Sequence, residues 1–407
     1  MTANRVLRLS WPEGVAALVG VTLVAWPSLN AAARPFLRVL PYLVLGSGLL
    51  VGWRFGRGRL LFALITLAAA DQSLAWFAPP PPPGSDIAHA GVLLISILLP
   101  ANLAALAFLP ETPAFGRVGR WWTAAFAGQL AFAASLCRAA PGAVGSVLSL
   151  PLFPMEPAWL PMSQFGLVAF VATAGLHGYR AWKAPTPTTR GLFWSTLVAL
   201  IAVNATAPGF RTLYLAVAGL VLLVSMIEAS YSLAFLDELT GLPGRRAFNQ
   251  ALSGLGGNYV IAMVDVDHFK QFNDQHGHDV GDQVLRLVAG RLSQVGDSGK
   301  GFRYGGEEFA VIFPDSTMED SRADLEALRI AIEASTFTFR GADRPKENPK
   351  GPKRDRPARR RDLSVTVSIG ATEPGSRNMT PASVTEAADQ ALYRAKETGR
   401  NRVVTTP

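Results

Sequence analysis

The sequence contains one cysteine, Cys137, in 407 residues, which excludes an intrachain disulfide framework and a cysteine-rich zinc site. Charged residues are also scarce, but only in the first part of the chain. Residues 1–236 hold 14 Lys or Arg and 6 Asp or Glu, so 20 of 236 are charged, about 8%. A soluble domain usually has about 25% charged residues. The first part is therefore not an ordinary soluble domain.

The remainder of the chain has an ordinary composition. Residues 237–407 carry 24 charges of each sign in 171 residues, about 28%. The formal net charge of +8 therefore belongs to the apolar part, where 14 minus 6 gives the same figure. A basic balance placed there gives little support to nucleic-acid binding, and no nucleic-acid partner is expected.

Apolar stretches dominate residues 1–231, and a spanning helix needs ~20 mostly apolar residues. We expect an all-α polytopic membrane bundle of about eight helices, followed by a helical linker at 232–236. The candidate spans are 14–31, 37–53, 60–77, 87–109, 121–137, 161–178, 192–207 and 212–232.

The basic residues between these spans predict the orientation. With eight spans, ten Lys or Arg lie at one set of ends and four at the other. The richer side is expected in the cytoplasm. Both termini, and the charged C-terminal part, would then be cytoplasmic.

Two acids fall within the predicted spans, Asp71 and Glu228. A charged group at membrane depth is costly and is a candidate functional site. A role in helix packing or at the membrane interface is the alternative for both residues.

The C-terminal part alternates between strand and helix patterns. We expect strands at 258–267, 302–304, 309–313, 363–369 and 402–405, and helices after 278 and at 318–336 and 381–397. The pair Gly305-Gly306 between two short strands predicts a hairpin that carries Glu307 and Glu308 at its tip.

The polar residues of this part suggest phosphoryl transfer. Asp265 and Asp267 are two apart, so they share one face of an extended strand. Together with the hairpin acids they offer the oxygen ligands that Mg²⁺ prefers. Two such ions can clamp the attacking and leaving oxygens of a displacement.

Other polar residues suit a nucleotide. Lys270, Lys396 and Arg400 can neutralise phosphates, and the last two share a helix face if the helix extends that far. Asn273 and Asp282 offer hydrogen-bonding groups that match guanine. Each signal alone also fits a solvated acid pair, a simple turn or a solvated helix face.

Five sequence blocks in one order resemble the GGDEF family of diguanylate cyclases, across residues 236–407. They are DELTGLPGRRAF (237–248), VDVDHFKQFNDQHGHDVGD (264–282), RYGGEEFAV (303–311), VSIGAT (367–372) and ADQALYRAKETGRNRV (388–403). The resemblance implies an α+β domain at 237–407, with a central antiparallel sheet flanked by helices as in nucleotidyl cyclases and polymerase palm domains.

The resemblance also implies the reaction and the roles of residues. Two GTP would become cyclic di-GMP and two pyrophosphates in a homodimer whose catalytic domains face each other. It assigns metal binding to Asp265, Glu307, Glu308 and the carbonyl of Val266, with Glu307 also helping to deprotonate the 3′-hydroxyl. It assigns GTP binding to Phe269, Lys270, Asn273, His278, Asp282, Gly305, Gly306, Lys396 and Arg400. Two Mg²⁺, or Mn²⁺, are expected in each active site.

Residues 340–362 are an insertion within this domain. They carry ten Lys or Arg against four acids, four prolines and no apolar periodicity. This composition favours a solvated mobile loop. Contact with anionic lipid headgroups is the second interpretation.

The sequence therefore predicts a diguanylate cyclase in the bacterial cytoplasmic membrane, regulated through its membrane region. Its expected partners are GTP, a second copy, the lipid bilayer and, indirectly, receptors of cyclic di-GMP. The alternative is a non-catalytic membrane receptor that binds a nucleotide and signals by contact.

Overall fold

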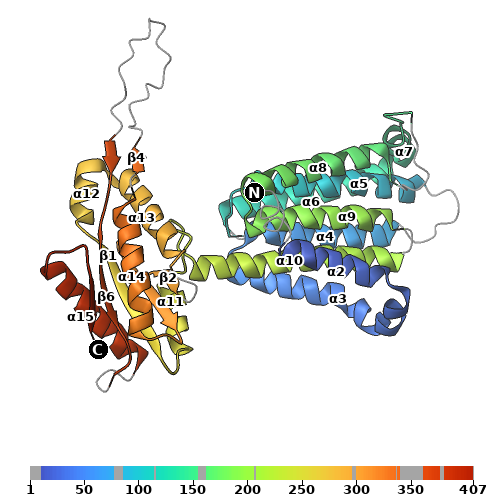
Figure 1. Ribbon diagram of the computed structural model, residues 1–407. Coiled ribbons are helices and arrows are strands. Elements are labelled where there is room, and N and C mark those ends of the chain that lie inside the picture. The colour runs from blue at the N-terminus through green and yellow to red at the C-terminus, as the bar shows by residue number, and fades with distance from the viewer. Residues whose placement is uncertain are drawn as a thin grey trace, which may run out of the picture. The chain divides into compact units, whose positions relative to one another are not determined.

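The computed structural model describes residues 11–77, 86–113, 116–154, 162–205, 208–295, 299–335, 337–339, 361–375 and 380–406. The chain forms two compact units, Met1–Ser230 and Tyr231–Pro407. Figure 1 shows helices in the first unit and a sheet with helices in the second.

The regular secondary structure in the described part of the N-terminal unit is all helical. Its helices are α2 (Glu13–Ala25), α3 (Pro27–Arg54), α4 (Gly58–Phe77), α5 (Asp86–Leu106), α6 (Arg117–Ala139), α7 (Pro141–Leu148), α8 (Gln164–Lys183), α9 (Pro187–Asn204) and α10 (Pro208–Phe235). The first predicted span, 14–31, is broken because Pro27 has no N–H and begins a new helix after Ala25.

Within the described ranges, three helices are long and apolar enough to cross a membrane: Gly58–Phe77, Asp86–Leu106 and Gly209–Phe235. The pair α6 and α7, bent by 103°, passes the same criteria as one broken span. The prediction of about eight spans is therefore not confirmed by these helices and stays a prediction.

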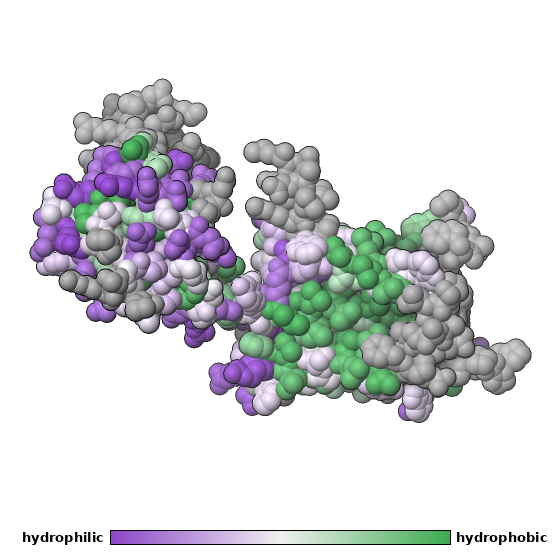
Figure 2. Space-filling view, turned by 60° about the horizontal axis from the view of Figure 1, so that its bottom comes forward, coloured by the Kyte–Doolittle hydropathy of each residue, from purple (hydrophilic) through white to green (hydrophobic). Residues whose placement is uncertain are grey.

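The surface of this unit is strongly apolar, as the green area over the helices in Figure 2 shows. Exposed large side chains occur on several helices, among them Leu18, Trp53, Trp121, Val171 and Ile227. Water-soluble proteins rarely expose contiguous apolar patches of this kind, which are typical of surfaces that contact a membrane or a partner.

Helices α2, α9 and α10 meet at a buried charge cluster that the sequence analysis did not anticipate. Arg190 on α9 donates to Glu13 through Nε at 2.9 Å and to Glu228 through Nη2 at 2.5 Å. Ser225 Oγ also donates to Glu13 at 3.3 Å. The Glu13 side chain is fully buried and that of Arg190 is 9% exposed. Glu228 thus joins helices, which agrees with the packing alternative.

Asp71 also joins two helices. Its Oδ1 on α4 accepts a hydrogen bond from the Thr212 hydroxyl on α10 at 2.7 Å. Both acids of the predicted spans therefore bind groups on neighbouring helices.

A five-stranded sheet forms the centre of the C-terminal unit, in the order β2-β3-β1-β6-β7. Its strands are β1 (Tyr259–Val266), β2 (Lys300–Arg303), β3 (Glu308–Pro314), β6 (Val367–Thr372) and β7 (Val403–Thr406). All neighbours are antiparallel except β6 and β7, so the expectation of an antiparallel sheet is wrong for that pair. The reason is α15 (Pro381–Glu397), which crosses over between the two strands.

Helices cover both faces of this sheet. On one face α13 (His278–Leu292) and α14 (Met318–Glu333) enclose a core that includes Val260 and Val264 of β1. On the other, α11 (Arg245–Ser253) and α15 pack with Ile261 and Met263. Strand side chains alternate between faces, so Asp265 points to the side of α15.

The strand predicted at 363–369 is divided into β5 (Arg361–Leu363), which pairs with β4 (Phe337–Phe339), and β6. Of the predicted basic loop, residues 340–360 lie outside the described residues. Arg361 and Asp362 belong to β5, so the loop is shorter than predicted at that end.

Candidate active site

Asp265 lies near the end of β1, beside the hairpin. In the sheet register it is opposite Glu308 on β3 and Ser368 on β6. Its Oδ2 lies 2.9 Å from the Lys396 ammonium on α15, and its side chain is only 6% exposed. The backbone N–H of Val266 donates to the Glu307 carbonyl at 3.4 Å. The strand pairing therefore brings both hairpin acids to Asp265.

These acids influence one another electrostatically. Burial raises the pKa of the Asp265 carboxyl to about 6. The nearby charges of Glu307 and Glu308 act in the same direction, while the hydrogen bond and charge of Lys396 oppose them. The site therefore holds more negative charge than Lys396 balances, which is the condition that favours a bound cation.

Asp267 has a different role from Asp265. Its carboxylate accepts hydrogen bonds at 2.7 Å from the hydroxyls of Thr366 and Ser368, and one at 3.1 Å from the backbone N–H of Asn401. These bonds fasten the end of β1 to β6, to the segment before it and to the turn after α15.

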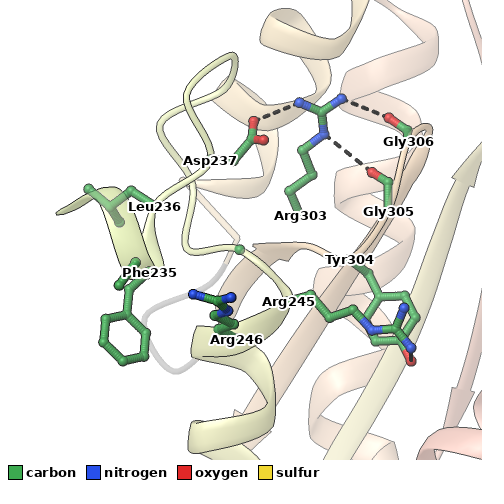
Figure 3. Close-up of a pocket in the computed structure, with 11 residues that line it drawn as sticks. Phe235, Leu236, Asp237, Arg245, Arg246, Arg303, Tyr304, Gly305 and Gly306 are labelled. Atoms are coloured by element: carbon green, nitrogen blue, oxygen red, sulfur yellow. Dashed lines mark hydrogen bonds and ion pairs between the residues drawn. The ribbon is translucent and has the colours of Figure 1, made fainter. Parts of the chain in front are cut away.

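The turn of the hairpin is held by Arg303. Its guanidinium donates to the Gly305 carbonyl at 3.3 Å and to the Gly306 carbonyl at 2.8 Å. A third bond, at 2.7 Å, reaches Asp237 just after α10. Figure 3 shows this fork joining the two segments, next to an open cavity of about 450 Å³.

Asp237 is in turn held by its own loop. Thr240 donates to it through its backbone N–H at 2.9 Å and its hydroxyl at 2.6 Å. Burial alone would raise the pKa of Asp237, but the bonds from Thr240 and Arg303 keep it below its ordinary value. This pair was not predicted, although Asp237 and Arg303 begin two of the five motif blocks.

Asn273 and Asp282, the two residues whose groups match guanine, lie on α12 (Phe269–His276) and α13. Asn273 Oδ1 is buried without a hydrogen-bond partner. A Cβ added at Gly281 would lie 1.9 Å from that oxygen, so the glycine leaves room for the carboxamide. A buried acceptor without a donor is costly, and a ligand donor would satisfy it.

The other predicted residues have less specific surroundings. Lys270 and His278 are exposed, whereas Phe269 is buried at the start of α12. Helix α15 ends at Glu397 and Arg400 has φ +61°. The condition for a shared helix face of Lys396 and Arg400, a helix that extends to Arg400, is therefore not met.

No three carboxylate, imidazole or thiol groups form a metal cage among the residues that the structure describes. Mg²⁺, however, usually takes one or two protein carboxylates and completes its shell with waters and substrate phosphates. The acid group around Asp265, with its excess negative charge, fits an ion that binds in this way.

Comparisons with known proteins find relatives of the C-terminal unit. The profile of the diguanylate cyclase GGDEF domain matches residues 234–348. Diguanylate cyclase DgcP of Pseudomonas aeruginosa is 38% identical over 187 residues, 44% of this chain and 25% of DgcP. Response regulator PleD of Caulobacter vibrioides is 38% identical over 186 residues, 44% of this chain and 37% of PleD.

The coiled coil and GGDEF domain of DgcB from Caulobacter crescentus, solved with c-di-GMP, is 33% identical. That match covers 44% of this chain and 90% of the other, with a TM-score of 0.37. The chain spans between a quarter and about half of the curated relatives it matches. On the matching profile and motifs, the C-terminal unit carries a GGDEF domain of the diguanylate cyclase family.

Proposed function

We propose that the protein is a diguanylate cyclase, which condenses two GTP into cyclic di-GMP and two pyrophosphates. One observation carries the proposal: the sheet register sets the GGEE hairpin beside a buried aspartate, with Glu308 opposite Asp265. Each 3′-oxygen would attack the α-phosphorus of the other GTP. That forms one P–O bond, breaks the bond to pyrophosphate and releases the hydroxyl proton.

The position of each site residue suggests its role in binding GTP or in catalysis. Glu307 lies at the hairpin tip and is proposed to accept the 3′-hydroxyl proton. Asn273 Oδ1, which lacks a donor, suits the N–H groups on the edge of guanine. Asp282, one helical residue beyond Gly281, would accept from the same edge. The exposed Lys270 and Arg400 would meet the phosphates.

Metal ions complete the proposed site. Asp265, Glu307, Glu308 and the Val266 carbonyl would hold two Mg²⁺ or Mn²⁺ ions. Such ions polarise phosphoryl oxygens and stabilise the charge that develops on them. The arginine fork on the Gly305 and Gly306 carbonyls would keep the hairpin acids in position before the nucleotide arrives.

We further propose that the protein acts as a homodimer in the cytoplasmic membrane. The three long apolar helices and the apolar surface of the N-terminal unit support a membrane location. Loop charges favour cytoplasmic termini and a cytoplasmic catalytic domain. A symmetrical reaction between two bound GTP requires two domains, and the membrane unit would regulate how they meet.

The test uses the full chain in nanodiscs, with GTP and Mg²⁺, and detects cyclic di-GMP by mass spectrometry. Product is expected from the wild type and not from Glu307→Gln. Glu319→Gln, an exposed acid on α14, is the matched control and should keep full activity. A folded protein that binds GTP but yields no product would instead favour the receptor function.

A further inference from the structure

Lys396 contacts the acid that the proposed metal would need. Its ammonium lies 2.9 Å from Asp265 Oδ2. In the described structure it is the cation that opposes the effects of Glu307 and Glu308 on this carboxylate. A divalent cation bound to Asp265 would therefore lie close to the Lys396 ammonium. At such a short distance the two positive charges repel each other.

Lys396 is also able to move away from Asp265. Its side chain is 32% exposed, against 6% for Asp265. It stands one residue before the end of α15, on a flexible four-carbon stem that carries a compact charge. A triphosphate is a stronger attraction for an ammonium than one carboxylate, because it carries several charges.

We propose that Lys396 is an exchangeable counter-ion, which holds Asp265 in the nucleotide-free protein and moves to phosphate oxygens when GTP binds. This inference rests on the proposed function, because it takes Asp265 as a metal ligand. Its consequence is that metal and nucleotide binding depend on each other through one side chain. Linkage requires the dependence to be reciprocal.

The experiment measures Mn²⁺ binding to the nucleotide-free full chain, in nanodiscs of zwitterionic lipid, from the electron paramagnetic resonance signal of free Mn²⁺. A pH of 8 keeps Asp265 ionised. Lys396→Gln should bind Mn²⁺ about tenfold more tightly than the wild type, within the usual range of such couplings. Lys396→Met should do the same.

Three controls make the result specific. Lys396→Arg keeps the charge and should bind Mn²⁺ as weakly as the wild type. Lys300→Met removes an exposed lysine of β2 and should leave nucleotide-free Mn²⁺ binding unchanged. Adding Asp265→Asn to Lys396→Gln should abolish the gain, because it removes the carboxylate that the ion takes.

Glutamine can still donate to Asp265, so Lys396→Gln is expected to fold, which its melting temperature will check. Unchanged or weaker Mn²⁺ binding by this folded variant would overturn the inference. The Mn²⁺ assay needs no turnover, so its result can reject the Lys396 exchange without rejecting the cyclase activity, and the reverse also holds. Tighter binding without any cyclic di-GMP would reject the cyclase alone, and active enzyme without tighter binding would reject the exchange alone.

Discussion

Each unit contains a basic side chain among acids, but the two clusters differ in chemistry. In the N-terminal unit, Arg190 is 9% exposed and its guanidinium binds Glu13, Glu228 and the Pro185 carbonyl together. In the C-terminal unit, Lys396 is 32% exposed and bonds one carboxylate. A planar group with five donors suits a permanent bridge, whereas a compact charge on a flexible stem suits exchange. The first cluster fixes helices and the second leaves a site able to change partners.

The largest effect is expected from breaking the buried bridge. Arg190→Met leaves the fully buried Glu13 without its cationic partner, which typically costs about 3–5 kcal/mol. Thermal unfolding of the full chain in nanodiscs measures the loss. Adding Glu13→Gln and Glu228→Gln should recover much of it. A variant as stable as the wild type would show that the bridge does not hold these helices.

The second prediction concerns pH and the exchangeable cluster. A raised pKa means that Asp265 contributes stability that is fully present below its unfolded pKa, 3.8, and lost as pH rises through about 6. Asp265→Asn has no such dependence. From pH 3 to pH 7 the variant should therefore gain about 3 kcal/mol relative to the wild type, since each pKa unit equals about 1.4 kcal/mol.

Urea unfolding of residues 231–407 at several pH values, followed by circular dichroism, measures this gain. The same compact unit has its own core, so it can be examined separately. Parallel stability curves for the two proteins would contradict a raised pKa at Asp265.

A third prediction concerns Arg303, which holds the turn of the hairpin in the C-terminal unit. Arg303→Met removes the three bonds that hold the Gly305 and Gly306 carbonyls and Asp237. Cyclase turnover should fall about 10²-fold, the usual cost of misplacing reactive groups by about 1 Å. Arg245→Met, which removes a cation over the Tyr304 ring in the same cavity, serves as the comparison and should keep most activity. Equal losses in both variants would argue against a positioning role.

The smallest effect is expected beside Asn273. Gly281→Ala places a Cβ 1.9 Å from its Oδ1 and should raise the KM for GTP about tenfold, a change of about 1.4 kcal/mol. Gly290→Ala lies on the same helix with nothing within 4 Å of the added carbon. It should leave the KM unchanged. If both variants behave alike, Asn273 does not read the base.

The sequence predicts local elements well where periodicity and motifs agree. The hairpin at Gly305-Gly306, the strand that carries Asp265 and the helix at 381–397 are confirmed by the structure. The parallel pairing of β6 and β7 was missed because it depends on how the chain crosses the sheet, which strand patterns do not encode. The positive φ of Arg400, just beyond this helix, was not predicted because a turn conformation depends on the contacts of the surrounding segments.

Contacts between residues far apart in the chain were also not predicted from the sequence. Nothing in the spacing of Glu13, Arg190 and Glu228 indicates that they meet, since they are up to 215 positions apart in the chain, from 228 minus 13. Asp237 and Arg303 each begin a motif block, and their opposite charges are the one feature of the sequence that suggests an ion pair between them. The division of roles between Asp265 and Asp267 required the partners of each carboxylate. Roles of single residues thus depend on tertiary contacts.

The bond between Asp237 and Arg303 also has a practical consequence for anyone who shortens this chain. A recombinant fragment that starts a few residues after Asp237 would retain every acid of the proposed metal site and every strand of the sheet. In that fragment Arg303 would still donate to the Gly305 and Gly306 carbonyls, but it would lose its bond to Asp237. Low turnover in such a fragment would then be mistaken for the loss of a membrane signal, so the cut belongs upstream of Asp237.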